Sequence, residues 1–144
     1  IISGIENTIA AGISPGYNII FGNIGETKES LKKGVDFLLK YDDCSQLRTI
    51  RPVTPYPGSS LYYYSLEKGL LKDCEDFYEN KHINSDLLSA NFTNLTDDEF
   101  HKELYNANKR LLNNYYEVQT KLALEASRKL YINHDSSFRG FRQT

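Results

Sequence analysis

The stretch "YNIIFGNIGETKESLKKGVDFLLKY", residues 17–41, joins a short apolar run to a glycine-bearing loop and then to an amphipathic pattern. Residues 17–21 are β-branched and aromatic, which predicts a short buried strand. From about Thr27 to Tyr41 the apolar residues recur at helical spacing, which predicts an amphipathic helix. The apolar positions of that helix are Leu31, Val35, Leu38 and Leu39. A strand followed closely by a helix is the unit from which α/β folds are built.

The strand-and-helix order is repeated further along the chain. The stretch "LRTIRPVT", residues 47–54, predicts a second strand. Ser59 or Ser60 can cap a following helix, which is expected to end at Gly69. The two strands are therefore expected to pair in parallel, with right-handed crossovers.

A short helix is predicted before the first strand. Ser3 and Glu6 fit a capping box, with Ile5 and Ile9 on the buried face and Gly12 at the end. Two strands alone do not make a stable parallel sheet, which needs more neighbours and cover on both faces. We therefore expect the chain to be a fragment of a longer protein. A first residue other than methionine, in a chain with no methionine at all, favours the same view.

The second half of the chain has a different character. Residues 76–94 are polar and poorly periodic, which predicts a boundary near residue 78. Thr96 and Glu99 fit a second capping box, which opens a long helix over residues 97–130, with a break near Asn113 as an open alternative. The apolar face of this helix is Phe100, Leu104, Leu111, Tyr115, Leu122 and Leu130. The sequence thus predicts an α/β part over residues 1–78 and a helical extension with a polar tail over residues 79–144.

Composition narrows the class of protein. The 144 residues are 40% hydrophobic and 25% charged, with a net charge of −2, which is typical of a soluble globular protein. No basic excess favours nucleic-acid binding. No apolar run is long enough to span a bilayer, and Glu6 interrupts the apolar start, so neither a membrane anchor nor a secretory signal is expected.

The reactive side chains show no metal or catalytic spacing. Cys44 and Cys74 are far apart, and neither has a second Cys or a His at ligand spacing, which favours two reduced thiols in a cytoplasmic protein. His82, His101 and His134 are expected to be ordinary surface residues. The sequence therefore predicts no metal site and no catalytic residue within the chain.

Alternation along the strands places one arginine at a candidate site. Successive strand residues face opposite sides, so Ile50 fits the helix-covered side and Arg51 the opposite side, the interior of a barrel. Asn18 and Ile20 of the first strand would share that inward side. An inward arginine near the carboxyl end of a parallel strand suits a carboxylate or phosphate, so Arg51 is predicted to bind substrate. The open alternative is a structural ion pair.

The two loops that follow the strands are also candidates for ligand contact. The glycines of "GNIGET", residues 22–27, permit positive φ and a close backbone approach to a ligand, although a plain strand-to-helix turn remains open. Pro55 and Pro57 hold the chain extended as it leaves the second strand, and Gly58 bends it. Such a stiff shelf meets a planar ligand at low ordering cost, and the alternative is a stiff connection without a ligand.

These two loops resemble the second half of a radical SAM domain. After strand five that family carries a "G-F-P-G-E-T" loop, which this chain matches at Gly22, Gly25, Glu26 and Thr27 and leaves at Asn23 and Ile24. The related "G-x-I-x-G-x-x-E" pattern is met at Ile20 and Gly22, with Asn18 in place of its first glycine and Glu26 one residue late.

The second match is the segment after strand six. Residues 55–62, "PYPGSSLY", resemble "P-Y-P-G-T-x-L-Y", with Ser59 in place of threonine and Gly69 ending the helix. Together the two motifs cover about residues 1–75. The stretch "NFTNLTDDEF", residues 91–100, further resembles the branch that carries an N-terminal cobalamin-binding domain.

The resemblance implies the C-terminal part of a partial (β/α) TIM-like barrel, followed by a helical extension. Radical SAM enzymes hold an iron–sulfur cluster on a Cys-x-x-x-Cys-x-x-Cys loop, which this chain lacks. The cluster cleaves S-adenosylmethionine reductively to give a 5′-deoxyadenosyl radical. The intact protein would thus be an enzyme, whereas this chain alone is expected to be inactive.

Family positions also imply a set of contacts to S-adenosylmethionine. Ile20 would pack on the adenine, and two sets of backbone atoms would border the cofactor. These belong to Gly22 and Asn23 after the first strand, and to Val53, Thr54 and Pro55 after the second. The implied partners are the missing N-terminal part of the barrel, an unidentified substrate and a cobalamin domain outside the chain. The chain alone is also expected to self-associate through an exposed apolar edge.

A second hypothesis needs no cofactor. The chain would then be a non-catalytic, α-rich protein-interaction module, in which the "PYPG" turn is structural and the late helix binds a partner. A tri-cysteine loop encoded upstream would reject this hypothesis.

Overall fold

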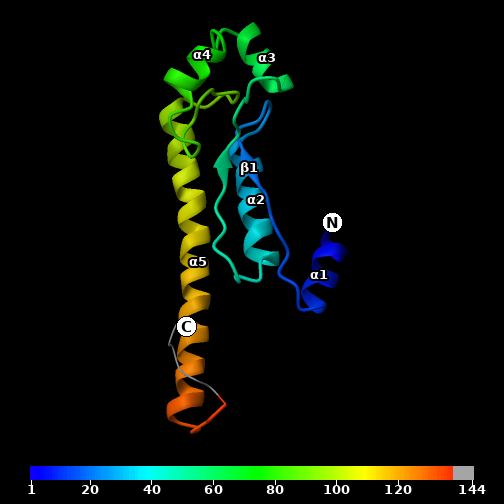
Figure 1. Cartoon of the computed structure of the whole chain (residues 1–144), viewed down its shortest axis with the longest axis vertical. Coiled ribbons are helices and arrows are strands. Elements are labelled where there is room, and N and C mark those ends of the chain that lie inside the picture. The colour runs from blue at the N-terminus through cyan, green and yellow to red at the C-terminus, as the bar shows by residue number, and fades with distance from the viewer. Residues whose placement is uncertain (138–144) are drawn as a thin grey trace.

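The computed structural model describes residues 1–137, which form a helix-rich, elongated molecule (Figure 1). The longest helix, α5 (Asp97–Tyr131), runs the length of the molecule beside α2 (Lys28–Tyr41). The strands are β1 (Ile20–Phe21) and β2 (Arg51–Pro52). The other helices are α1 (Ile2–Ala10), α3 (Ser60–Glu67), α4 (Cys74–Asp76) and a π-helix (Phe77–Lys81). In residues 1–137 we find no helix with the length and apolar character needed to cross a bilayer.

The predicted order of strands and helices is confirmed, and the two strands pair in parallel. Ile20 lies opposite Arg51, and Phe21 opposite Pro52. The N–H of Val53 donates to the carbonyl of Phe21 at 2.8 Å. Each strand is only two residues long, shorter than predicted, because each has a single neighbouring strand within the described residues.

Helix α2 begins where the sequence predicts. Thr27 is the N-cap, and its side chain accepts a hydrogen bond from the N–H of Ser30 at 3.3 Å, while the Ser30 hydroxyl accepts from the N–H of Thr27. Leu31, Val35 and Leu38 are buried, so the predicted apolar face is confirmed.

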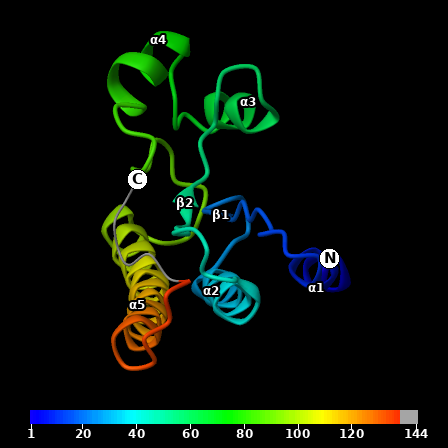
Figure 2. The ribbon, with the colours of Figure 1, turned by 60° about the horizontal axis from the view of Figure 1, so that its bottom comes forward.

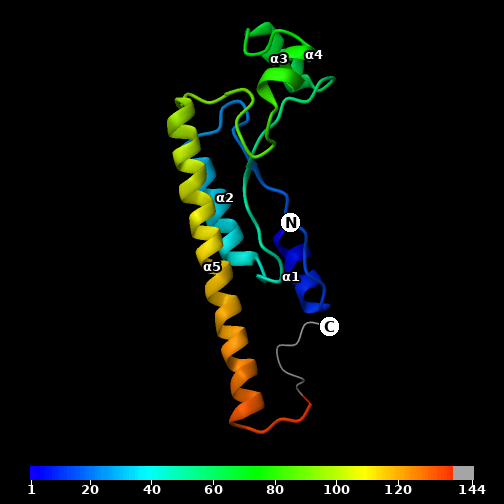
Figure 3. The same cartoon turned by 60° about the vertical axis from the view of Figure 1, so that its left-hand side comes forward.

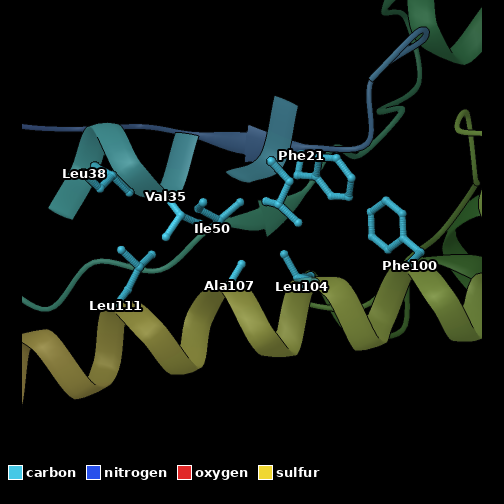
Figure 4. Packing of buried hydrophobic residues seen from close by; sticks show 9 residues of the cluster. Phe21, Val35, Leu38, Ile50, Phe100, Leu104, Ala107 and Leu111 are labelled. Atoms are coloured by element: carbon cyan, nitrogen blue, oxygen red, sulfur yellow. The ribbon is translucent and has the colours of Figure 1, made fainter. Parts of the chain in front are cut away.

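The main core lies between the strands, α2 and α5 (Figure 4). Phe21 and Ile50 point from the strands toward α5, and the rings of Phe21 and Phe100 stack with centroids 4.9 Å apart. The remaining core residues are Leu31, Val35, Leu38, Leu104, Ala107 and Leu111. This core joins residues from both sides of the predicted boundary at residue 78, and the division into two domains stays a prediction.

Helix α5 is one unbroken helix of 35 residues. Its N-cap is Thr96, and the capping box with Glu99 is present, as predicted. The predicted apolar face is buried only as far as Leu111. Leu122 is 59% exposed because the helix extends beyond the residues that cover its first half.

Helix α1 differs most from the sequence prediction. It begins at Ile2 without a side-chain cap, so the capping box of Ser3 and Glu6 is wrong. The helix ends near Gly12, which has a φ of +73°, as predicted. None of its residues is buried, and Ile9 is 40% exposed. The predicted buried face is wrong for the described chain because no element packs over it.

A second, smaller core lies beneath α3. Ser59 is the N-cap, and its hydroxyl accepts from the N–H of Tyr62 at 3.1 Å. Tyr62, one of three consecutive tyrosines, is buried with Leu71 and Phe77. Helix α3 ends before Gly69, which has a φ of +68°.

Candidate functional site

The two strands have one covered face and one open face. Phe21 and Ile50 point to the covered face, where α2 and α5 pack. On the opposite face Ile20 is 46% exposed, and Thr49 and Arg51 are also exposed. The alternation predicted from the sequence therefore places Ile20 and Arg51 on the same, open face.

A shallow hollow of about 230 Å³ lies on the amino-terminal side of this open face. It brings together Arg51 and two polar side chains that precede the strands, Asn18 and Thr49, so it lies at the opposite end of the strands from the two loops that follow them. An amide, a hydroxyl and a guanidinium in one hollow can donate hydrogen bonds to a small anionic group.

Arg51 is held by an ion pair that leaves it accessible. Its Nε lies 3.0 Å from Oδ1 of Asp86, and both side chains are 61% exposed. Exposed ion pairs contribute about 0–1 kcal/mol, so an anionic ligand can displace Asp86 at low cost. An ion pair at Arg51, the alternative that the sequence left open, is therefore present. Its carboxylate, Asp86, belongs to this chain.

Arg48, three residues earlier, shows what a structural arginine looks like in the same region. Its Nε lies 3.4 Å from the Asp42 carboxylate, and its other end donates to the carbonyl of Pro15 at 2.8 Å. The guanidinium also lies over the ring of Tyr17. Burial raises the pKa of Asp42, and the neighbouring Arg48 opposes that rise. These contacts occupy the hydrogen-bonding groups and the face of the Arg48 guanidinium. Arg51 has one exposed ion pair instead.

The loop after β1 is closed by its own glutamate. The carboxylate of Glu26 accepts from the N–H of Gly22 at 2.7 Å and from the N–H of Asn23 at 2.8 Å. Gly22 and Asn23 were predicted to border a cofactor through their backbone. Their backbone amides already donate to Glu26, and the Asn23 carbonyl accepts from the N–H of Glu26 at 3.0 Å, so little backbone hydrogen-bonding capacity remains here for a ligand.

The glycine at position 22 has a packing role that the sequence did not reveal. Its φ is +103°, and a Cβ built there would lie 2.7 Å from the ring of Phe100. The close approach that Gly22 permits in this structure is therefore to α5. Phe100 is 78 positions away in the chain, so no local pattern could have identified the contact.

The positions after β2 are mostly enclosed. The side chains of Val53 and Pro55 are buried, and Thr54 is half-buried. The Val53 N–H is used in pairing with β1, and the Thr54 carbonyl accepts from the N–H of Tyr56 at 3.0 Å. This segment is mostly enclosed and has little free hydrogen-bonding capacity, and its role as a stiff shelf for a ligand stays a prediction.

The "PYPG" turn rests on an aromatic group that includes a histidine. Tyr56 is half-exposed, and its ring packs against Phe77 and His82. His82 stacks on Phe77 with centroids 5.0 Å apart, and its Nε2 lies 3.5 Å from the Tyr56 hydroxyl. His82 is therefore half-buried in a packed group and not the ordinary surface residue that we expected. His101 is also half-buried, and its Nδ1 lies 2.9 Å from the carbonyl of Asp97.

The chain does not offer ligands for an iron–sulfur cluster. Its sequence has two cysteines, of which Cys44 is buried and Cys74 is exposed, and both are free thiols. Burial raises the pKa of the Cys44 thiol, and its sulfur accepts from the Asn114 amide. Across residues 1–137 no group of three or more His, Cys, Asp or Glu side chains is placed to hold a metal ion.

No protein-family model, curated protein or solved structure matches the chain. The family resemblance therefore rests on the two loop motifs and on their separation along the sequence.

Proposed function

We propose that the chain forms the last two strands of a radical SAM barrel, with an open face that contributes part of the wall around S-adenosylmethionine. The observation that carries the proposal is the arrangement of the two motif loops. Because β1 and β2 are parallel neighbours, the Gly22–Glu26 loop and the "PYPG" loop leave the same end of the strands. Ligands of parallel α/β folds bind at this carboxyl end.

The outer edge of β2 supports its place as the last strand of a sheet. The side-chain amide of Asn108 accepts from the N–H of Ile50 at 2.8 Å and donates to the Ile50 carbonyl at 2.9 Å. The next residue with its backbone turned to that edge is Pro52, which has no N–H. Further strands can therefore be added only on the side of β1.

The proposed contacts follow from which atoms remain available. Ile20 offers an exposed apolar side chain for the adenine. The backbone at Gly22 and Asn23, the half-buried Thr54 and the buried side chains of Val53 and Pro55 shape the wall. Arg51 binds an anionic part of the substrate and exchanges Asp86 for it.

When bound, the cluster and S-adenosylmethionine supply the radical chemistry. The part of this chain is to position the ligand and to exclude water with a preformed wall. The cluster ligands, the remaining strands and the cobalamin domain implied by the resemblance belong to the rest of the proposed protein. A reducing cytoplasm, which keeps both thiols free, is the proposed compartment.

The first test is to read the coding sequence upstream of Ile1. An in-frame Cys-x-x-x-Cys-x-x-Cys motif is expected. The longer protein, reconstituted with its cluster, should then release 5′-deoxyadenosine from S-adenosylmethionine. A start codon directly before Ile1, with no such cysteines, would overturn the proposal.

A pair of variants of the longer protein then tests the wall itself. Ile20→Glu places a charge where the adenine would pack, and we expect at least a tenfold weaker affinity for S-adenosylmethionine. Leu124→Glu makes the same kind of change on an exposed part of α5 and should leave that affinity unchanged. For the 144-residue chain alone we expect weak binding or none, and a tight calorimetric isotherm would contradict this.

A protein-interaction module is the second candidate, and the free end of α5 favours it. Within residues 1–137, Gln119 is the last residue of α5 that hydrogen-bonds to an earlier segment of the chain, from its Nε2 to the Cys44 carbonyl. Beyond it Leu122, Leu124 and Tyr131 are all more than half exposed. This candidate predicts that a partner is lost with Leu122→Glu and retained with Ile20→Glu, the reverse of the cofactor result.

A further inference from the structure

The outer edge of β1 presents backbone groups without a partner strand. The carbonyl of Phe21 faces β2, where it accepts from Val53. Backbone groups of successive strand residues point to alternate edges, so the N–H and C=O of Ile20 point away from β2. Within residues 1–137 the sheet has two strands, and nothing pairs with this edge. Unpaired edges are templates for another strand.

The opposite edge of the sheet cannot serve as such a template. The Asn108 side chain occupies both backbone groups of Ile50, and Pro52 removes the next donor. Each copy of the chain therefore has one usable edge. Association through a single self-complementary edge closes as a two-fold dimer and does not continue into a fibre.

The free edge also lacks the charges that usually keep strands apart. Between Ile1 and Gly25 the sequence has a single charged side chain, Glu6. Natural edge strands are typically protected by lysines, prolines or bulges. The β1 segment itself therefore brings no like-charged side chains against those of a second copy.

An apolar groove of about 550 Å³ lies beside this edge, between α1 and the approach to β1. Figures 2 and 3 show α1 on the side of the molecule away from α5, where it packs on no other helix. The apolar residues that line the groove are Ile1, Ile2, Ile5, Tyr17, Ile19 and Phe37. The groove therefore adds apolar surface beside the free edge of β1.

We propose that two copies of the 144-residue chain associate through β1, whose edge pairs antiparallel with β1 of the second copy. Ile20 is the exposed apolar side chain that each β1 brings to the contact. The result is a four-stranded sheet in which both edges blocked by Asn108 lie outside. This inference does not depend on the proposed function. In a longer protein the preceding strands would occupy the same edge, whereas the chain alone leaves it to a second copy.

Sedimentation equilibrium over a concentration series tests the dimer. We expect a dimer mass at tens of micromolar and dissociation on dilution. Ile20→Lys and Asn18→Lys put charges beside the pairing edge at exposed positions and should each weaken association at least tenfold. Leu124→Lys, an equal change at an exposed leucine of α5, should leave association unchanged.

Amide hydrogen exchange supplies a readout that does not depend on variants. The Ile20 amide should be protected at high concentration and exposed on dilution. The Ile50 amide should be protected at both, because Asn108 holds it within each copy. A monomer at every concentration, equal effects of the Ile20 and Leu124 variants, or Ile20 exchange independent of concentration would overturn the proposal.

Discussion

Helices α5 and α1 flank the same two strands and differ in nearly every physical respect. The first half of α5 is capped by Thr96, carries charges in its first turn and buries Phe100, Leu104, Ala107 and Leu111. Helix α1 has no side-chain cap and buries nothing, although it is rich in isoleucine. The difference shows that apolar residues on a helix are not sufficient for a core, because a second surface must be present to cover them. The chain supplies that surface on the β2 side of the molecule and leaves it open on the β1 side.

Among these variants, Phe100→Ala in α5 is expected to change the free energy of unfolding most. Phe100 is fully buried against Phe21 and beside Gly22. Its removal should lower the free energy of unfolding by about 3–5 kcal/mol, from lost burial and the cavity that remains. Urea unfolding at one fixed protein concentration measures this effect. Tyr105→Ala, at an exposed position of the same helix, is the control and should stay within about 0.5 kcal/mol.

The next largest effect is expected from Asn108→Leu. This change keeps the branched shape of the side chain but leaves the N–H and C=O of Ile50 without their partner. Unsatisfied groups of this kind cost about 1–3 kcal/mol. The exchange rate of the Ile50 amide should rise in the variant. Asn113→Leu, on an exposed part of α5, is the matched control, and an unchanged Ile50 rate would show that Asn108 does not close this edge.

Thr96→Ala should remove about 1 kcal/mol, because the N-cap oxygen of α5 is lost. The hydrogen bonds from Thr96 also hold the pKa of Glu99 below its usual range. A depressed carboxyl pKa stabilises the folded state at neutral pH, and this contribution disappears as the pH falls through the folded pKa. The difference in stability between wild type and variant should therefore narrow in acid, and a difference that widens would contradict the capping role.

The smallest effect is expected on the other side of the comparison. Ile9→Ala in α1 should change the free energy of unfolding by no more than about 0.5 kcal/mol, because the side chain is poorly covered. Leu104→Ala in α5, at an equally apolar position, should cost about 2–5 kcal/mol. Equal costs at the two positions would mean that α1 is packed in solution.

Local features of the fold could be predicted from the sequence with good success. The start of α2 near Thr27 and the caps at Ser59 and Thr96 were each readable within four residues, because the interacting groups are neighbours in the chain. Strand alternation placed Phe21 on the covered face and Ile20 on the open face. Each of these features follows from a period or spacing that a short window contains.

Features that depend on distant residues could not be predicted. The contacts of Asn108 with Ile50 join residues 58 positions apart, and Phe100 meets Gly22 across a still longer separation. The stacking of His82 on Phe77 arises from a π-helical turn, which no periodicity indicates. The contact of Glu26 with the amides of Gly22 and Asn23 is local, but the sequence did not predict it. A carboxylate next to the start of a helix can make several kinds of contact, and the sequence does not distinguish them.

The length of α5 has a consequence for how the protein moves through water. At 1.5 Å per residue its 35 residues span roughly 52 Å, whereas a compact chain of this size has a radius of gyration of roughly 15 Å. The frictional drag on one copy is therefore that of a rod-like particle and exceeds the drag on a sphere of equal mass. A single copy should elute early from a calibrated sizing column and mimic a heavier species. Only methods that report mass independently of shape can separate one elongated copy from two.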